Sequence, residues 1–450
     1  MNSLSLIHDS LLEFNWNYAS HPKISKVSPF LAQPTPEQCA NIELVAEDLR
    51  DGLQGAMRYP TVDEMLEYIN LLHSFGITRL SLGVFSGTRN KLDYTIKSLL
   101  REVYKHYPNI IPIVACPITK QAMDWALTCK KAHPNVQVSF FMGMSGLKCI
   151  AEGWTKGYVL NEMEKAFKWA QSNSIRTLGV IENATQANPD FIKDVILTQV
   201  KNGATAIIIA DTVGIARPVA VARIIQFVKQ ILKSIDAEYV GIEWHGHRDL
   251  GNDMQNTFTA IACGVKSIHT VARGIGERAG NTRLESVVLN LYQIAKESGY
   301  AVPWDLSKLL NILQLYDKIA DLPPPIHGPL GNHFNYTNVG THCSAILHLL
   351  QKADDAEKNK SKIKALWFRK KAQNIYNAFD MDVLGINSIS IGVGPFSGKS
   401  SVLLAHKLLT GKKKNLSLIK INKVLTYAKK IRRVMSMDEL LRLFRGVKPK

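Results

Sequence analysis

Eight short apolar runs, separated by segments of helical length, constrain the fold of this 450-residue chain more than any other feature. Strands that alternate with helical segments are typical of parallel βα units, and eight such units between residues 40 and 305 predict a closed (β/α)8 TIM barrel. An open doubly wound sheet is the alternative, but no G-x-G-x-x-G string follows the first run. The runs are IELVAEDLRD (42–51), TRLSLGVF (78–85), IIPIVAC (110–116), VQVSFFMGM (136–144), TLGVIENA (177–184), TAIIIADT (205–212), YVGIEWHGH (239–247) and VKSIHTVA (265–272).

Polar residues stand at the expected carboxyl ends of several of these strands. Active sites of such barrels gather at those ends and in the loops that follow. Each residue alone is better explained as a loop boundary, but together they would lie on one rim. They are Arg50 and Asp51 after the first strand, Glu182 after the fifth, Asp211 and Thr212 after the sixth, His245 and His247 after the seventh, and Asn281 after the eighth.

His245 and His247 are separated by one residue, so in a strand both side chains leave the same face and can share one metal ion. Asp51 and Asn281 would add carboxylate and amide oxygens, which completes a ligand set for a divalent cation. Mg²⁺ or Mn²⁺ is expected, although two histidines also tolerate Zn²⁺. Arg50 beside this set indicates chemistry on an anion, such as formation or cleavage of a carbon-carbon bond next to a polarised carbonyl.

The composition, with 46% apolar and 21% charged residues, is that of an ordinary soluble globular protein. The first twenty residues lack a basic start and a sustained apolar segment, and no apolar run approaches the roughly 20 residues that span a bilayer. The six cysteines form no C-x-x-C pair, which indicates reduced thiols. We therefore expect a cytoplasmic protein without membrane insertion.

The positive charge is concentrated at one end of the chain. Residues 401–450 hold 14 Lys and Arg against 2 acidic residues, which is +12 of the net charge of +17. A basic amphipathic helix that meets acidic partners or membrane surfaces is one interpretation, and a solvated helical end is the favoured one. No zinc-finger spacing or RNP-like string supports binding to nucleic acid.

Four ordered strings resemble the isopropylmalate synthase and homocitrate synthase family. They are LRDGLQ (49–54), ADTVG (210–214), WHGHRDLG (244–251) and GIGERAGNTRLE (274–285). That family belongs to a metal-dependent barrel superfamily that includes 3-hydroxy-3-methylglutaryl-CoA lyase. The resemblance implies that Asp51, His245 and His247 are metal ligands, with Asn281 in or beside the shell. It further implies that Arg50 is catalytic and contacts substrate with Gln54, that Thr212 holds a 2-oxoacid carboxylate, and that Glu182 is an acid on the floor of the site.

The resemblance continues past the barrel and favours a synthase over a lyase. NYTNVGTHCSAILHLL (335–350) is similar to a synthase segment that supplies a histidine, here His342, and NIYNAFDMDVLGINSISIGVGPFSGKSSV (374–402) places Tyr376 at a tyrosine position. In synthases these subdomains cross to the neighbouring subunit, so a homodimer is implied. The expected divisions are an extension (1–39), the barrel (40–305), a helical subdomain (306–365) and a second subdomain with the basic tail (366–450). No leucine-type regulatory domain is expected, because only 50 residues follow Ser400.

Three positions depart from familiar patterns. Many relatives carry glutamate in an I-E-x-G string where this chain has LSLG with Ser81, and H-x-H-N-D commonly stands where this chain has Arg248. Glu243 shares the strand face of His245 and His247, so it could supply the missing carboxylate as a catalytic group and pair with Arg50; a buried acid satisfied by a neighbouring cation is the equal alternative. GPFSGKS lacks the first glycine of a P-loop, because position 393 is valine, and is interpreted as a structural turn.

The implied reaction is a Claisen condensation of acetyl-CoA, the co-substrate, with a 2-oxoacid, followed by hydrolysis of the thioester. His342 with Tyr376 would act as the base or its support. A metal-dependent lyase or aldolase is the first alternative, and a non-catalytic regulatory barrel is the second. The sequence leaves open which 2-oxoacid is used, because pocket shape among the barrel loops decides that.

Overall fold

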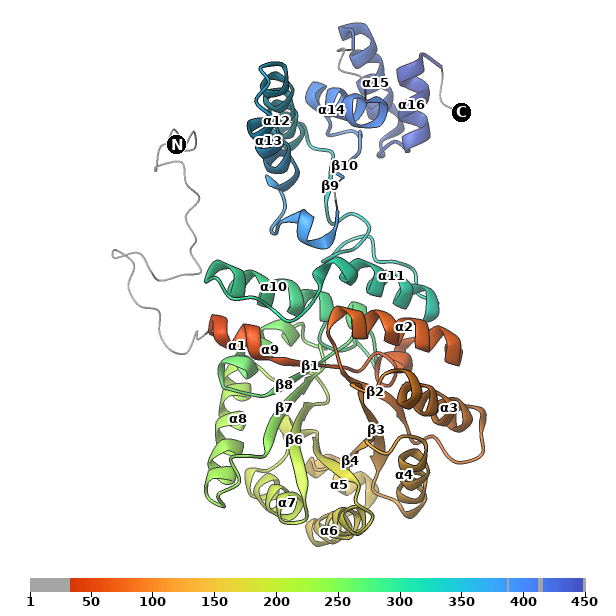
Figure 1. Cartoon of the computed structure of the whole chain (residues 1–450), viewed down its shortest axis with the longest axis vertical. Helices are drawn as coiled ribbons and strands as arrows, with labels where there is room; N and C mark the ends of the chain where they lie inside the picture. Colours follow the sequence, from red (N-terminus) through yellow and green to blue (C-terminus); the bar gives the residue numbers. More distant parts are fainter. Residues whose placement is uncertain (1–32, 387, 412–415, 448–450) are drawn as a thin grey trace, which may run out of the picture.

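The computed structural model describes residues 33–386, 388–411 and 416–447. Eight parallel strands close into a barrel in sequence order, with β8 next to β1 and helices on the outside (Figure 1). The expected (β/α)8 barrel with helical segments after it is confirmed. The strands are β1 (Glu43–Ala46), β2 (Arg79–Val84), β3 (Ile111–Pro117), β4 (Gln137–Gly143), β5 (Arg176–Glu182), β6 (Ala204–Asp211), β7 (Gly241–Gly246) and β8 (Ser267–Thr270).

Several helices of the barrel begin at side-chain caps that the sequence supplies. Thr61 starts α2 with a capping box, because its hydroxyl accepts from Glu64 N while the Glu64 carboxylate accepts from Thr61 N. Gly76 ends α2 at φ 113°, where glycine is favoured. The helices of this part are α1 (Pro36–Asn41), α2 (Val62–Phe75), α3 (Lys91–His106), α4 (Lys120–Ala132), α5 (Gly146–Glu152), α6 (Lys156–Ser172), α7 (Pro189–Lys201), α8 (Pro218–Lys233), α9 (Asp253–Ala262), α10 (Leu284–Glu297) and α11 (Leu309–Ile319).

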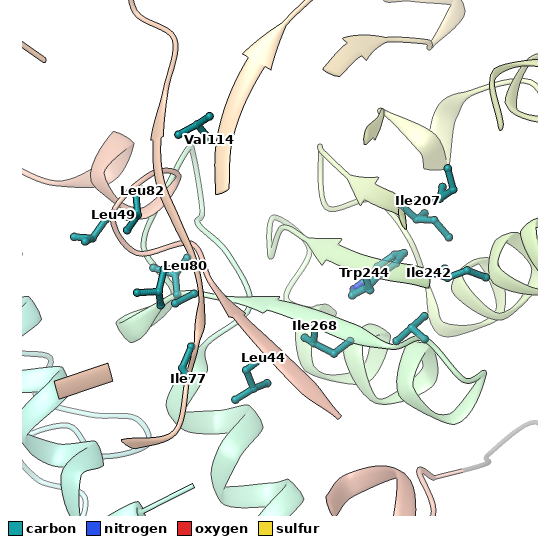
Figure 2. Packing of buried hydrophobic residues seen from close by; sticks show 14 of the residues in the cluster. Leu44, Leu49, Ile77, Leu80, Leu82, Val114, Ile207, Ile242, Trp244 and Ile268 are labelled. Atoms are coloured by element: carbon teal, nitrogen blue, oxygen red, sulfur yellow. The ribbon is translucent and has the colours of Figure 1, made fainter. Parts of the chain in front are cut away.

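The two faces of the barrel strands differ in polarity, because successive side chains point to opposite faces. Outward residues are apolar and pack in the main core, part of which is shown in Figure 2; they include Leu44, Leu80, Leu82, Val114, Ile207, Ile242, Trp244 and Ile268. A separate apolar cluster inside the barrel contains Val45, Ile113, Leu178, Ala206 and Ile208. Polar inward residues occupy the other strands, so the interior can carry charge that the outer core excludes.

Several strands end before the residue that the sequence predicted, and the difference is largest for β1. β1 stops at Ala46, and residues 47–51 form a turn that leads into a 3-10 helix, η3 (Gly52–Gly55). β7 stops at Gly246, so His247 follows the strand directly. Arg50 and Asp51 therefore reach the mouth of the barrel on a loop, which corrects the expectation that they end the first strand.

Buried contacts hold the turn after β1. The Asp48 carboxylate accepts hydrogen bonds from Ala272 N at 2.7 Å and from Tyr68 Oη at 2.9 Å. Tyr316 Oη donates to the carbonyl oxygen of Asp48 at 2.9 Å. Glycine is needed at position 52, since a Cβ there would lie 2.2 Å from Tyr316 Oη. These contacts tie the turn to the loop after β8 and to α11.

A second group of helices lies beyond α10 and α11 (Figure 1). It has its own apolar core and comprises α12 (Gly340–Lys358), α13 (Lys362–Asn374), α14 (Lys399–Thr410), α15 (Leu418–Ile431) and α16 (Met437–Arg445). A short parallel pair, β9 (Tyr336–Thr337) and β10 (Ser390–Ile391), accompanies them. The expected boundary at residue 306 stays a prediction, because α11 packs in the barrel core and the second core starts at Cys343. Residues 1–32 of the expected extension lie outside the described residues.

The GPFSGKS string forms the turn before α14. The Ser397 hydroxyl accepts from Gly394 N at 2.9 Å and donates to the carbonyl oxygen of Asn338 at 2.6 Å. The string is thus tied to the segment before α12, which agrees with a structural turn. Across the described ranges, each helix is too short or too polar to cross a membrane.

Candidate active site

A cavity of about 220 Å³ lies at the carboxyl ends of the barrel strands. Seven residues that the sequence predicted at the site line it, namely Arg50, Asp51, Gln54, Glu182, Thr212, His245 and His247. The apolar part of its wall consists of Val84, Ile113, Ala115, Phe141, Val180, Ile208 and Ala210. The structure therefore places most of the predicted rim around one small cavity with charged and apolar walls, while Asp211 and Asn281 are outside its described lining.

Asp51, His245 and His247 form a group that can hold a metal ion, because one ligand atom of each lies within 4.8 Å of the others. Nε2 of His245 is 3.3 Å from Nε2 of His247 and 3.7 Å from Oδ2 of Asp51. Asn281 closes the group, since its Nδ2 donates to Asp51 Oδ1 at 2.8 Å. All four residues are buried. The four expected ligands are therefore adjacent, and their binding of a metal stays a prediction.

The donor set fits a divalent cation. At this group of the described chain, Asn281 Oδ1 is buried without a hydrogen-bond partner. Such an unsatisfied group costs about 1–3 kcal/mol, so a ligand that engages it is favoured. Gly276 leaves room for the group, because a Cβ there would lie 2.2 Å from Asn281 Nδ2 and 2.9 Å from Asp51 Oδ1. Imidazole nitrogens with carboxylate and amide oxygens suit Mg²⁺, Mn²⁺ or Zn²⁺.

The protonation states of this group also suit a cation. Burial lowers the pKa of His245 to about 3 and lowers the pKa of His247, so both imidazoles are neutral at pH 7. Burial alone would raise the pKa of Asp51, but the charge of the Arg50 guanidinium, with the hydrogen bond from Asn281, outweighs it and lowers that pKa. An ionised carboxylate and neutral imidazoles are the forms that bind metal.

Arg50 lies between two carboxylates at the edge of the cavity. Its Nε and Nη2 donate to Glu47 Oε2, each at 2.8 Å, and its Nη1 donates to Asp51 Oδ2 at 2.6 Å. Burial would lower the pKa of Arg50, but these two carboxylates raise it. The side chain is 19% exposed, so a permanent cation with a fixed orientation faces the cavity.

The expected pairing of Glu243 with Arg50 is wrong, because Glu47 takes that position. The Glu243 carboxylate accepts from Arg79 Nη1 at 2.9 Å and from His269 Nε2 at 3.0 Å. Glu243 shares the inward face of β7 with His245, as the period of the strand requires, but in the described chain it is not part of the cavity lining. Its expected role at the reacting atoms is therefore unsupported, and its partners match the alternative of a buried acid satisfied by nearby cations.

The position where relatives carry glutamate is buried in this chain. Ser81 is 1% exposed on β2 and pairs with Ile113 of β3. Arg248, the second departure, follows β7 and donates its backbone N–H to the carbonyl oxygen of Gly280 at 3.0 Å. This bond joins the loop after β7 to the glycine-rich loop that carries Asn281.

The loop after β6 presents Thr212 to the cavity. Asp211 holds this loop, since its carboxylate accepts from Thr185 Oγ1 at 2.7 Å and from Ala216 N at 3.2 Å. Thr212 Oγ1 accepts from Asn183 N at 2.8 Å, which leaves the hydroxyl proton available to a bound acceptor. Burial also raises the pKa of Asp211. The Asp211 carboxylate is thus occupied by hydrogen bonds within the loop. Thr212 is the residue of this loop that is placed to bind a ligand.

Glu182 ends β5 on the same rim. Burial raises the pKa of Glu182, and the charge of Lys148 partly offsets this shift. Gln54 reaches the rim from η3 and is exposed. Both positions agree with the predicted rim, and their contacts with substrate stay predictions.

His342 and Tyr376 lie together but outside this cavity, as far as the described residues extend. Their rings stack with centroids 4.0 Å apart, which brings the start of α12 next to the end of α13. Tyr376 is 47% exposed and His342 is exposed as well. The pair is therefore accessible on the second group of helices rather than part of the barrel mouth of its own chain.

Five further polar residues line the cavity without having been singled out as site residues from the sequence, namely Glu47, Ser139, His269, Glu277 and Arg278. Glu47 and His269 are polar residues at inward positions of otherwise apolar runs, and a check of strand parity would have found them. Arg278 belongs to the GIGERAGN string, and its Nε donates to Asp249 Oδ1 at 2.9 Å.

Known proteins share both the sequence pattern and the barrel. A 2-isopropylmalate synthase from Acetivibrio thermocellus is 33% identical over 164 residues, which are 36% of this chain and 31% of the relative. A 2-isopropylmalate synthase from Brevibacillus brevis is 28% identical over 63% of this chain and 54% of the relative. A homocitrate synthase from Methanothermobacter thermautotrophicus is 26% identical over 71% of this chain and 78% of the relative. The chain thus spans about a third to about half of the length of these two isopropylmalate synthases.

Solved structures share the fold. The hydroxymethylglutaryl-CoA lyase from Pseudomonas aeruginosa superposes with a TM-score of 0.53 at 17% identity, over 62% of this chain and 93% of the lyase. The HMG-CoA lyase from Brucella melitensis gives a TM-score of 0.51 at 17% identity, over 62% of this chain and 99% of the lyase. The HMGL-like family model matches residues 41–315, which is more than half of the chain and contains the whole barrel. On this match the chain belongs to the HMGL-like family.

Proposed function

We propose that this chain is a 2-isopropylmalate synthase-like acyltransferase, which condenses acetyl-CoA with a 2-oxoacid and hydrolyses the resulting thioester. The observation that carries the proposal is the buried Asp51, His245 and His247 group with the Arg50 guanidinium beside it in one cavity. Relatives named 2-isopropylmalate synthase and homocitrate synthase support the same class of reaction.

Each residue of the rim has a part in this reaction. Asp51, His245 and His247 would hold the divalent ion, with Asn281 in or beside its shell. When bound, the ion supplies Lewis-acid polarisation of the keto carbonyl. The Thr212 hydroxyl donates to the carboxylate of the 2-oxoacid, with Gln54 beside it. Arg50 donates to the keto oxygen as that oxygen becomes negative.

The carbon-carbon bond requires an enolate of the acetyl group. A base removes one methyl proton from acetyl-CoA, the enolate carbon attacks the keto carbon, and the keto oxygen takes a proton. Water then cleaves the thioester, which releases the CoA thiol and a second carboxylate. Glu182, whose pKa is raised by burial, would exchange protons on the floor of the site.

His342, supported by Tyr376, is the proposed base for the methyl proton. Their exposed stack lies outside the cavity of the same chain in the described residues, so the pair would act on the barrel of a second copy. This arrangement agrees with the homodimer that the sequence predicts, in which the helical subdomains cross to the partner.

The apolar wall of the cavity favours an acceptor with a small apolar substituent. Arg50 and Arg278 are the two Lys or Arg residues in the described lining, and both are engaged by carboxylates. A second substrate carboxylate against Val84, Ile113 and Phe141 would be desolvated without a partner, which is unfavourable. A branched or short 2-oxoacid is therefore proposed over a 2-oxo dicarboxylic acid.

The test is a panel of 2-oxoacids with acetyl-CoA, in which release of the CoA thiol is followed with Mn²⁺, Mg²⁺ or Zn²⁺ and with chelator. We expect thiol release that requires both an acceptor and a metal, and that fails in His245→Ala. Absence of thiol release with every acceptor would contradict the synthase. Cleavage of a 3-hydroxyacyl-CoA to acetyl-CoA in its place would support the lyase alternative.

A further inference from the structure

A line of buried charged side chains runs through the barrel interior and ends at Arg50. Arg79 Nη1 donates to Glu243 Oε1 at 2.9 Å, and Glu243 Oε2 lies 3.0 Å from His269 Nε2. His269 Nδ1 lies 2.7 Å from Glu47 Oε1, and Glu47 Oε2 accepts from Arg50. The four residues before Arg50 are each at most 6% exposed. Arg79 and Glu243 belong to strands that are not neighbours, so the line crosses the barrel.

His269 is the link on which the line depends. Each of its ring nitrogens faces one carboxylate oxygen, so a single imidazole bridges Glu47 and Glu243. Because both neighbours are carboxylate oxygens, which accept, each ring nitrogen of His269 is placed to donate to one of them.

A second metal site is the alternative explanation, since Glu47, His245 and His269 also lie within reach of one ion. Both nitrogens of His269 already have partners at hydrogen-bond distance, whereas Asn281 Oδ1, beside Asp51 in the other group, is buried without a hydrogen-bond partner among the described atoms. The contacts thus favour a hydrogen-bonded bridge at His269 and an ion at Asp51, His245 and His247.

We propose that His269 is a positioning residue that fixes the carboxylate of Glu47 and, through it, the guanidinium of Arg50. With one oxygen held by His269, Glu47 cannot rotate, and its other oxygen takes both Nε and Nη2 of Arg50. Arg50 then donates to Asp51 through a single nitrogen, Nη1. If Glu47 were released, Arg50 would turn toward Asp51 and compete with the cation for that carboxylate.

The inference rests on the proposed function for the role of Arg50, but it can be tested without turnover. Mn²⁺ is titrated into the metal-free full-length chain by calorimetry for the wild type, His269→Gln, Glu47→Gln and the double variant. Loss of a residue that supports a metal ligand typically weakens metal binding by about 10–100-fold, and we expect this for His269→Gln. The double variant should bind Mn²⁺ no more weakly than Glu47→Gln alone, because His269 acts through Glu47.

The kinetic constants give a second measurement. Poor placement of Arg50 removes an interaction that is made in the transition state, so kcat should fall by about tenfold or more in His269→Gln while KM for the 2-oxoacid stays within about twofold. His133→Gln is the matched control, since His133 is also a buried histidine, lies at the end of α4, and is outside the described cavity lining. It should retain both Mn²⁺ affinity and kcat.

Three outcomes overturn the proposal. The first is unchanged Mn²⁺ affinity in a folded His269→Gln variant, and the second is additive losses of Mn²⁺ affinity in the double variant. The third is a wild type that binds two Mn²⁺ ions, of which His269→Gln loses one. If His269→Gln does not fold, Glu47→Asp takes its place. The shorter side chain keeps the charge but moves the carboxylate away from His269 and Arg50. A wild type that does not bind Mn²⁺ would instead contradict the metal site of the proposed function.

Discussion

The Nε2 atom of His245 lies 3.3 Å from the Nε2 atom of His247, and burial lowers the pKa of both imidazoles. The strand geometry of β7 brings the two rings to one face, and the loop after β1 places the Asp51 carboxylate beside them. Two nitrogens and a carboxylate oxygen that converge in this way would hold the divalent ion that the proposed function requires.

Metal binding should stabilise the folded chain. A cation that binds the folded form alone adds about 2.7 kcal/mol to the free energy of unfolding at 100 times its Kd. We expect Mn²⁺ to raise the Tm of the wild type, and chelator to reverse the rise. His245→Ala should lose this response, whereas His106→Ala, an exposed histidine on α3, should keep it. An equal rise in Tm for His245→Ala would place the ion elsewhere.

Arg50→Lys should lower turnover more than substrate binding. Lysine keeps the charge but cannot engage Glu47 and Asp51 together as the guanidinium does. Loss of one preorganised donor to a developing oxyanion costs about 10²–10³ in kcat, and we expect a fall in that range with KM for the 2-oxoacid little changed. Arg58→Lys is the control, because Arg58 pairs with Glu64 near the surface. Equal losses in both variants would count against a special role for Arg50.

Thr212→Val should raise KM for the 2-oxoacid by about 10- to 150-fold, because a hydrogen bond to a charged group contributes about 1.5–3 kcal/mol. Thr212→Ser keeps the hydroxyl that accepts from Asn183 N and should retain a KM near that of the wild type. Initial rates at varied 2-oxoacid and saturating acetyl-CoA measure the effect. A valine variant with normal KM would remove Thr212 from the carboxylate site.

Asp48 should make the stability of the chain depend on pH. Burial raises the pKa of Asp48 to about 7, whereas an unfolded aspartate has a pKa of about 3.9. Between these values the folded chain retains a proton that the unfolded chain releases, so this residue's contribution to stability falls as pH rises from about 4 to 7, by up to about 1.4 kcal/mol per pH unit. Asp48→Asn resembles the protonated form and should lose this slope in urea unfolding at pH 5, 6 and 7. A variant with the wild-type slope would contradict it.

Arg50→Lys and His342→Ala should complement each other if His342 acts on the barrel of a second copy. After random exchange of subunits, half of the dimers are mixed and one of the two sites in each has both native residues. About one quarter of the wild-type activity should then return. If His342 acts within its own chain, each mixed site carries one of the changes and the activity stays at the level of the separate variants.

The eight strands and the faces of their side chains could be predicted from the sequence because they depend on local pattern. Short apolar runs separated by segments of helical length indicated the eight strands. The shared face of His245 and His247 followed from the two-residue period of β7. Asp51 could be assigned to the same rim through the order of the βα units, even though the end of β1 was predicted five residues too late. The error arose because the turn at residues 47–51 is fixed by distant partners, Ala272, Tyr68 and Tyr316.

The sequence by itself therefore determined the barrel and most of the residues on its rim, since these follow from side-chain periodicity and from the common direction of parallel strands. The tertiary structure alone decided which buried charges meet. Glu47 pairs with Arg50, and Glu243 of β7 contacts Arg79 of β2 and His269 of β8. The sequence does not give the distances between these side chains. Ion pairs in an interior depend on separations of a few ångströms between distant segments, and no local pattern specifies such separations.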